Sequence, residues 1–153
     1  MRFNVGMRTV TVSFDVYTFH IDYSGHVSNI AYVQWMEITR LKLLEQVGLS
    51  VQEMAEKRGV IPVLTETQIA YRKALYFGDV VRVEAWLSEL KPASAWVEYR
   101  FYNPAGELAA SGRQKGVYLH RDTLRPYRMG KEERALLEPY LHTSPEGDAS
   151  PEE

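Results

Sequence analysis

The sequence predicts an α+β domain in which an antiparallel sheet of about five strands wraps around one long central helix. Two observations carry this prediction. Apolar residues recur at helical spacing over residues 29–47, and four strand-like stretches separated by turn residues follow. The connections between these strands are short. Short connections favour antiparallel pairing, because parallel strands need a longer crossover.

The first element is a strand over residues 10–16, where apolar and polar side chains alternate as in a strand with one buried face. The helix over residues 29–47 comes next, and Gly48 suits its C-terminal cap. Its apolar stripe consists of Ile30, Val33, Met36, Leu41, Leu44 and Val47, widened by Ile38 and Leu43. A stripe of this width predicts a helix that is covered on much of its circumference.

The second half of the chain predicts a short helix, four strands and a final surface helix. Ser50 and Glu53 form a capping-box pattern for the short helix, which stops near Gly59. The strands are expected over residues 60–74, 80–90, 95–102 and 107–120, and the surface helix over residues 131–137. Within the third of these strands apolar and charged side chains alternate, so one face of the sheet should be apolar and the other charged.

Composition narrows the class of protein. The 153 residues suit one domain, expected over residues 1–142, with a disordered acidic tail over residues 143–153. The 18 basic and 20 acidic residues give a net charge of −2, which argues against a nucleic-acid surface. The absence of cysteine excludes a disulfide framework and a thiol nucleophile. No apolar run approaches the roughly 20 residues of a membrane span, and residues 1–10 lack a signal-peptide core, so we expect a cytoplasmic protein.

The turn between the first strand and the long helix carries the residues best suited to chemistry. It reads Asp22-Tyr-Ser24-Gly-His26-Val-Ser-Asn29. A helix N-terminus presents backbone N–H groups with no partner inside the helix, so it can receive a negatively charged oxygen. A carboxylate just before it can attack a carbonyl group, or activate water to do so. The arrangement suits acyl transfer.

The residues from Asp22 to Arg40 also resemble a family signature. The pattern Asp-x-x-Gly-His-Val-x-Asn-x-x-Tyr-x-x-Trp-x-Glu-x-x-Arg is similar to that of hotdog-fold acyl thioesterases of the 4-hydroxybenzoyl-CoA thioesterase type. It is also similar to the Asp…His-Val-Asn-Asn…Tyr motif of acyl-carrier-protein thioesterases. The turn Gly78-Asp79 matches the family too, and the resemblance covers residues 10–127.

This resemblance implies a hotdog fold, in which a curved antiparallel sheet wraps the central helix. It implies hydrolysis of an acyl thioester, either acyl-CoA or acyl carrier protein (acyl-ACP), with no cofactor beyond the CoA of the substrate. It further implies a homodimer or homotetramer formed by pairing sheets edge to edge. Such pairing would also cover open edge strands.

Four residues of the turn are candidates for the site, and the resemblance supplies the roles of Asp22, Asn29 and His26. Asp22 takes the place of the catalytic carboxylate, as general base or nucleophile; the alternative is a structural turn residue. The backbone N–H of Asn29 would bind the thioester oxygen, and a helix-capping side chain is the alternative. His26 would orient Asp22 or a water molecule, unless it only packs within the turn. Ser24 is assigned to the substrate site, where it could position a water molecule beside Asp22.

Several positions depart from the family pattern. Ser24 stands where the carrier-protein enzymes have asparagine. Thr18 and Asn29 replace a tyrosine and a histidine of bacterial short-chain members, and His20 replaces a usual acid. Asp22 is retained, but these changes leave the mechanism and the substrate of any one subfamily open.

A metal site at His20, Asp22 and His26 is an alternative that we do not favour. Thioester hydrolysis in this family needs no metal, and no further cluster of ligands follows in the sequence. We therefore expect neither a metal nor a separate cofactor.

Further residues have possible roles outside the turn. Tyr32, Trp35 and Met36 are expected to pack between helix and sheet, with lining of an acyl pocket as the alternative. Glu37 and Arg40 have the spacing of an ion pair on the helix. The candidates for holding CoA phosphates are Arg72, Lys73, Arg113, Lys115, Arg121, Arg125 and Arg128.

Two other functions compete with hydrolysis. One is a non-catalytic acyl-CoA-binding module, because fold alone does not decide function. The other is a hydratase or dehydratase, which ranks last because those enzymes place their catalytic histidine differently. Release of free thiol from a panel of acyl-CoA substrates would separate the three.

Overall fold

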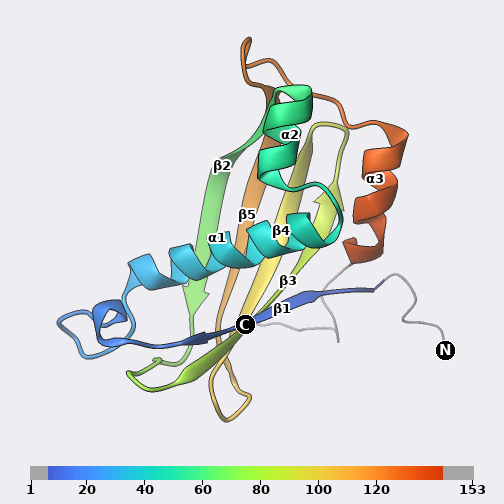
Figure 1. Ribbon diagram of the computed structural model, residues 1–153. Coiled ribbons are helices and arrows are strands. Elements are labelled where there is room, and N and C mark those ends of the chain that lie inside the picture. The colour runs from blue at the N-terminus through green and yellow to red at the C-terminus, as the bar shows by residue number, and fades with distance from the viewer. Residues whose placement is uncertain (1–6, 143–153) are drawn as a thin grey trace.

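The computed structural model describes residues 7–142 and contains one five-stranded antiparallel sheet crossed by a long helix (Figure 1). The elements are β1 (Val10–Asp15), η1 (Thr18–His20), α1 (Asn29–Gln46), α2 (Val51–Arg58), β2 (Val60–Tyr71), β3 (Val80–Leu90), β4 (Ser94–Tyr102), β5 (Leu108–His120), α3 (Lys131–Leu137) and η2 (Glu138–Tyr140). The strand order is β1-β3-β4-β5-β2. The predicted α+β architecture is confirmed, whereas the predicted tail over residues 143–153 lies outside the described residues.

Helix α1 has the predicted extent to within one residue. It begins after Ser28 and ends at Gln46, and Gly48 follows with a φ of 85°. The N–H of Leu49 then donates to the carbonyl oxygen of Leu44 at 2.9 Å, which satisfies a carbonyl at the end of the helix. The left-handed conformation at Gly48 explains why a glycine follows the helix here.

The face of α1 that meets the sheet differs from the predicted stripe. Its buried residues are Ala31, Tyr32, Trp35, Met36, Thr39, Leu43 and Leu44. Ile30, Val33 and Ile38 were expected in the covered stripe, but they are 68%, 41% and 41% exposed. The prediction was wrong because α1 carries apolar residues around much of its circumference, so their spacing does not single out one face.

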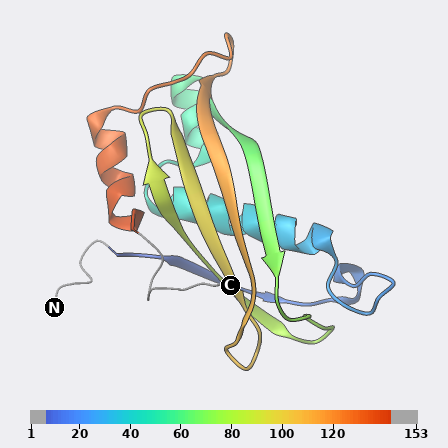
Figure 2. The same cartoon turned by 180° about the vertical axis from the view of Figure 1, so that it is seen from behind.

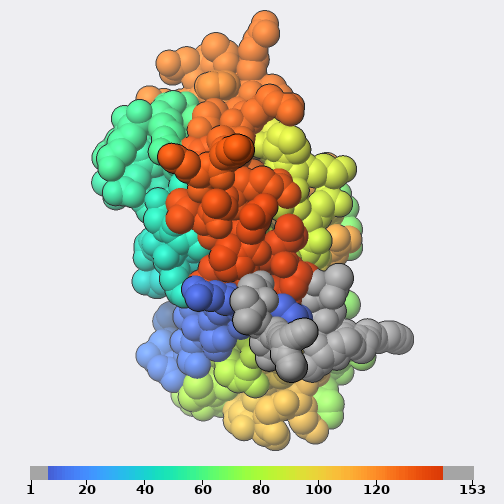
Figure 3. Space-filling model, turned by 90° about the vertical axis from the view of Figure 1, so that its right-hand side faces the viewer, coloured from blue at the N-terminus to red at the C-terminus, as the bar shows by residue number. Residues whose placement is uncertain are grey.

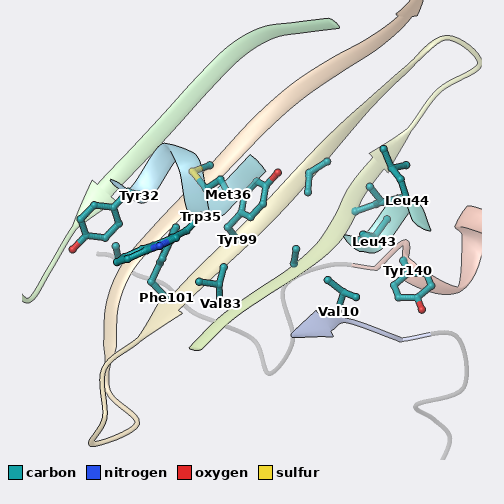
Figure 4. Close-up of a cluster of buried hydrophobic side chains, with 14 of the residues drawn as sticks. Val10, Tyr32, Trp35, Met36, Leu43, Leu44, Val83, Tyr99, Phe101 and Tyr140 are labelled. Carbon is teal, nitrogen blue, oxygen red and sulfur yellow. The ribbon is translucent and has the colours of Figure 1, made fainter. Parts of the chain in front are cut away.

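The N-terminal half of α1 packs tightly against the sheet (Figure 4). The Trp35 ring stacks on Phe14 of β1 with a centroid separation of 5.6 Å, and the Tyr32 ring meets Phe101 of β4 edge-on at 5.2 Å. Met36 is fully buried. The expected packing of Tyr32, Trp35 and Met36 between helix and sheet is confirmed.

The two short helices cover the other end of the sheet. The Ser50 hydroxyl accepts from the N–H of Glu53 at 3.2 Å, as the capping pattern predicts, and Gly59 ends α2. Helix α3 lies beside α2 and above β1 (Figure 3). The buried carboxylate of Glu133 joins the two helices, because it pairs with Arg58 and accepts from the Tyr127 hydroxyl.

The two edges of the sheet differ in length. Strand β1 has six residues, whereas β2 has twelve and is exposed over residues 64–68. Helices α1 and α2 both lie on one face, and Figure 2 shows the other face of the sheet. That face carries charged side chains, including an ion pair of 3.1 Å between Arg113 and Glu98. The predicted alternation in β4 is therefore confirmed. Within residues 7–142, no helix has the length and apolar character needed to cross a membrane.

Candidate active site

The turn before α1 is held at both of its ends. We refer to residues 20–28 as the site loop. The N–H of Ser28 donates to the carbonyl oxygen of His20 at 2.8 Å, which closes the loop on itself. The N–H of Val27 donates to Leu75 beyond β2 at 2.9 Å. The loop therefore has a fixed position at the start of α1, although many of its side chains are exposed.

A tight turn at the tip of the loop presents Asp22. The N–H of Gly25 donates to the carbonyl oxygen of Asp22 at 3.0 Å, and the N–H of Asp22 donates to His26 at 3.0 Å. Gly25 has a φ of 87°, a conformation that side chains with a Cβ rarely adopt. The glycine of the signature thus has a conformational role in placing the acid.

The carboxylate of Asp22 is exposed and oriented by Ser24. Its Oδ1 accepts from the Ser24 N–H at 2.8 Å and from the Ser24 hydroxyl at 2.5 Å. These bonds, with a smaller contribution from the nearby His26 charge, lower the pKa of Asp22 below its ordinary value. Ser24, expected to position a water molecule, here contacts Asp22 itself. Both bonds from Ser24 fall on Oδ1.

The start of α1 follows the loop directly. Asn29 is its first residue and Ser28 its N-cap, and the Ser28 side chain makes no capping hydrogen bond. The alternative role of Asn29 as a capping side chain is therefore wrong, because the capping position belongs to Ser28. The first N–H groups of a helix lack partners within it, so this end of α1 can donate to an anionic oxygen.

His26 lies against a residue that the sequence reasoning did not assign. Its ring meets Tyr76 edge-on with a centroid separation of 5.3 Å. Tyr76 begins the predicted turn at Gly78, and its N–H donates to the Asp79 carboxylate at 2.9 Å. The adjacent carbonyl of Asp79 accepts from Val16 at 2.9 Å, which ties the turn to the end of β1. The nearby Gly-Asp turn was the signal that could have identified Tyr76.

His20 is used inside the fold. Its side chain is buried, and its Nδ1 accepts from the N–H of Tyr17 at 2.9 Å. Its ring meets Trp35 edge-on at 5.1 Å. Burial lowers the pKa of His20, which favours the neutral ring at neutral pH. The structure therefore gives His20 an anchoring role at the base of the site loop.

Arg40 belongs to a buried polar network and not to the expected pair with Glu37. Its guanidinium donates to Gln114 Oε1 at 2.5 Å, and the Tyr99 hydroxyl donates to the same oxygen at 2.7 Å. The Gln114 amide in turn donates to Thr67 on β2 at 3.2 Å. Burial raises the pKa of Tyr99 to about 12, so its hydroxyl stays protonated. The network links α1 to three strands.

A cavity of about 340 Å³ lies beyond this network, between the C-terminal half of α1, helix α2 and the sheet. Its walls are mainly apolar, and they include Leu41, Leu44, Val51, Leu64, Ala95 and Gly116. Glu37 lines it as well and lies eight residues after Asn29, so the cavity begins about 12 Å along α1 from the helix start. The sequence reasoning did not identify this cavity.

The candidate CoA-phosphate residues do not form one group. Lys73 pairs with Glu107 at 3.2 Å, and Arg113 lies over the Trp96 ring at 3.9 Å on the outer face of the sheet. Arg121, Arg125 and Arg128 follow β5 at the α2 end of the sheet and are exposed. These three arginines are the candidates that gather in one segment.

Comparison with known proteins identifies the family of this chain. The sequence model described as the Thioesterase-like superfamily matches residues 16–137. The chain belongs to this superfamily. The matched residues include the site loop, α1 and all strands except β1. The predicted recognition of an acyl thioesterase family is confirmed at this level, while the 4-hydroxybenzoyl-CoA subfamily stays a prediction.

Relatives in the superfamily agree in fold. YneP of Bacillus subtilis strain 168, named as a candidate acyl-CoA thioesterase, is 29% identical over 110 residues, covering 72% of this chain and 79% of that protein. The DHNA-CoA thioesterase structure from Staphylococcus aureus superposes with a TM-score of 0.77 at 25% identity, covering 86% of this chain and 88% of that one. These relatives support acyl-CoA thioester hydrolysis in general terms.

A third similarity concerns the fold alone. The structure of SAV2348 from Staphylococcus aureus, determined in complex with CoA, superposes with a TM-score of 0.81 at 19% identity. It covers 95% of this chain and 97% of that one. Together with the thioesterase structure, it confirms the predicted hotdog fold.

Proposed function

We propose that this protein hydrolyses acyl-CoA thioesters at the site loop, with Asp22 as the catalytic carboxylate. One observation carries the proposal: an ionised, exposed carboxylate is held by Ser24 in the loop that leads into the start of α1. An ionised carboxylate can accept a proton from water or attack a carbonyl carbon itself. The names of the relatives favour CoA thioesters over acyl carrier protein as the substrate.

The general-base route fits the site in the following way. Oδ2 of Asp22 takes a proton from water as the water oxygen bonds to the thioester carbon. The developing oxyanion accepts hydrogen bonds from N–H groups at the start of α1, beginning with Asn29. The C–S bond then breaks, and the CoA thiolate takes the proton back from Asp22. His26, whose ring meets Tyr76, lies in the same loop beside Asp22.

The alternative is nucleophilic attack by Asp22, which would form a mixed anhydride. A single turnover in heavy-oxygen water separates the two routes. The general-base route places the label in the product acid at once, and we favour it because Ser24 orients the carboxylate. An unlabelled first product, with label recovered in the Asp22 peptide, would instead establish the nucleophilic route.

We also propose a homodimer, or a homotetramer of two such dimers, built by antiparallel pairing of β2 edges. Strand β2 is a long edge strand with an exposed middle, which invites pairing with another strand. The site loop and the start of α1 extend past this edge (Figures 1 and 2). A two-fold axis beside β2 would bring the partner's site loop to the α2 end of this sheet. Light scattering that gives a monomer at micromolar concentration would contradict this assembly.

Substitution of Asp22 tests the catalytic assignment. We expect Asp22→Asn to lower kcat/KM for acyl-CoA hydrolysis at least about 100-fold, a loss typical of a missing general base. Asp15→Asn is the matched control, because Asp15 is also exposed but precedes the site loop at the end of β1. Thiol release gives the rate, and circular dichroism checks the fold. Near-normal turnover by a folded Asp22→Asn protein would exclude Asp22 as the catalytic group.

A further inference from the structure

We propose that the cavity between α1, α2 and the sheet holds the acyl chain of the substrate, and that Gly116 and Ala95 set the chain length. The inference rests on the proposed function, because it names the acyl group of the same reaction. The class of substrate that it specifies is an unbranched aliphatic acyl-CoA of medium length. Four features of the cavity support this assignment.

The first feature is the chemistry of the walls. Among the residues that line the cavity, only Glu37 and Arg40 carry charged side chains. Glu37 is exposed, and Arg40 is already bonded to Gln114. Apart from Tyr118, the remaining lining is aliphatic, so a hydroxylated aromatic acyl group would lose most of its hydrogen bonds to water there without replacing them. An alkyl chain loses nothing and gains from burial.

The second feature is the pair of small residues on the floor. Gly116 on β5 lies between Leu64 on β2 and Ala95 on β4 in the register of the sheet. A Cβ placed on Gly116 would have its nearest neighbours, Leu64 Cδ2 and the Val63 carbonyl oxygen, at 3.9 Å. A glycine within a strand often marks a close approach to a ligand. Here the absence of a side chain at Gly116 and the small side chain of Ala95 leave the floor open.

The third feature is the volume. A cavity of about 340 Å³ lies at the lower end of the range for small-molecule sites. A methylene group needs about as much room as a water molecule, whose share of the liquid is about 30 Å³. The cavity therefore has room for about ten carbon atoms, which corresponds to an acyl chain of medium length.

The fourth feature is the position of the opening. The exposed Glu37 and the 39% exposed Leu64 place it between α1 and the edge strand β2. This is the edge at which the proposed dimer brings the partner's site loop. A thioester held at the Asp22 of the partner subunit could thus pass its acyl chain into this cavity.

Binding to a non-hydrolysing protein tests the inference apart from catalysis. The Asp22→Asn protein is titrated with acetyl-, butyryl-, octanoyl- and decanoyl-CoA in a calorimeter. We expect affinity to rise with chain length up to decanoyl-CoA. Adding Gly116→Leu fills the floor, so we expect it to weaken decanoyl-CoA binding at least about tenfold, since the leucine takes the place of several methylene groups whose burial favours binding. Acetyl-CoA binding should not change.

Two controls keep the result interpretable. Ala135→Leu adds a leucine on the exposed side of α3, outside the cavity, and should leave the chain-length profile unchanged. Gly116→Ala is a milder variant in case the leucine impairs folding, and it should weaken decanoyl-CoA binding by a smaller factor. An affinity that is independent of chain length, or a profile that Gly116→Leu leaves intact, would overturn the inference. A wild-type protein that releases no thiol from any of these substrates would instead overturn the proposed function.

Discussion

Two glycines on β5 face helix α1 four residues apart, yet their surroundings differ. A Cβ on Gly112 would lie 2.9 Å from the Met36 Cε atom, so the methionine already fills the space above that glycine. A Cβ on Gly116 would have no neighbour closer than 3.9 Å. The first glycine allows helix and sheet to approach closely, whereas the second leaves a cavity.

The difference divides the interface between α1 and the sheet into a packed half and a hollow half. The packed half, around Tyr32, Trp35 and Met36, lies beside the site loop and anchors the start of α1 (Figure 4). The hollow half lies toward α2, and the network of Arg40 and Gln114 separates the two. Rigid packing thus lies next to the loop that carries the proposed catalytic acid, and space is left where we propose that the acyl chain binds.

The largest effect is expected from a substitution in the packed half. Trp35→Ala should lower the free energy of unfolding by about 3–5 kcal/mol, because it removes a buried indole that contacts Phe14 and His20. Val33→Ala, on the exposed side of α1, is the control and should change it by less than about 0.5 kcal/mol. Denaturant unfolding gives both values. Equal losses for the two variants would remove the distinction between the packed face and the exposed face.

A smaller loss of stability is expected from substitution of the first glycine, Gly112. Gly112→Ala should lower the free energy of unfolding by about 1–3 kcal/mol, because the added methyl group overlaps the Met36 Cε atom in a filled core. The double variant with Met36→Leu, which lacks that terminal methyl group, should recover part of the loss. A Gly112→Ala protein as stable as the wild type would show that this half has room to adjust.

A gain in stability is expected from substitution of the second glycine, Gly116. Gly116→Ala should raise the free energy of unfolding by about 0.5–1 kcal/mol, because alanine costs less backbone entropy than glycine in a strand. The new methyl group makes only ordinary contacts at 3.9 Å. Loss of stability at Gly116 comparable to that at Gly112 would contradict the proposed division.

The smallest effect is expected from substitution of Ser24, which should change the pKa of Asp22 in the site loop. Ser24→Ala removes the hydroxyl bond that lowers the pKa of Asp22, so that pKa should rise toward its ordinary value. Because the ionised carboxylate is the active form, the acid limb of the pH–rate profile should move to higher pH. Activity near neutral pH should change little, since Asp22 stays ionised there. Ser28→Ala, at a capping position without a side-chain bond, should leave the limb in place.

The sequence allowed the elements to be predicted better than their faces. Strand β3 and helix α3 have the predicted bounds, because clear turn residues flank them. Ile30 was assigned to the covered stripe and is exposed, while Thr39, which was not assigned to it, is buried. A helix with apolar residues on all sides gives no periodic signal for its orientation. The side of α1 that is buried depends on how the helix packs against the sheet, which its own sequence does not specify.

In the candidate site, too, the sequence predicted local geometry but not contacts between distant residues. Asp22 and the start of α1 were predicted together because they are neighbours in sequence, and local spacing determines such geometry. The cavity was not predicted, because Leu64, Ala95 and Gly116 meet only through the register of three strands. The bond between Arg40 and Gln114 likewise joins residues far apart in the sequence. Only the glycine inside a predicted strand gave a local hint of the open floor.

The ordinary backbone conformation of Gly116 has a consequence for how this protein can diverge. A single base change converts a glycine codon into one for alanine or valine, and each step adds a side chain to the floor of the cavity without straining the strand. If the cavity holds the acyl chain as proposed, descendants of this gene could therefore shorten the preferred chain in small increments without changing the site loop. Gly112 has less freedom, because its first added carbon would lie 2.9 Å from Met36 Cε and 3.3 Å from the Gln68 carbonyl oxygen. Substrate range and structural integrity can thus be selected separately along one strand.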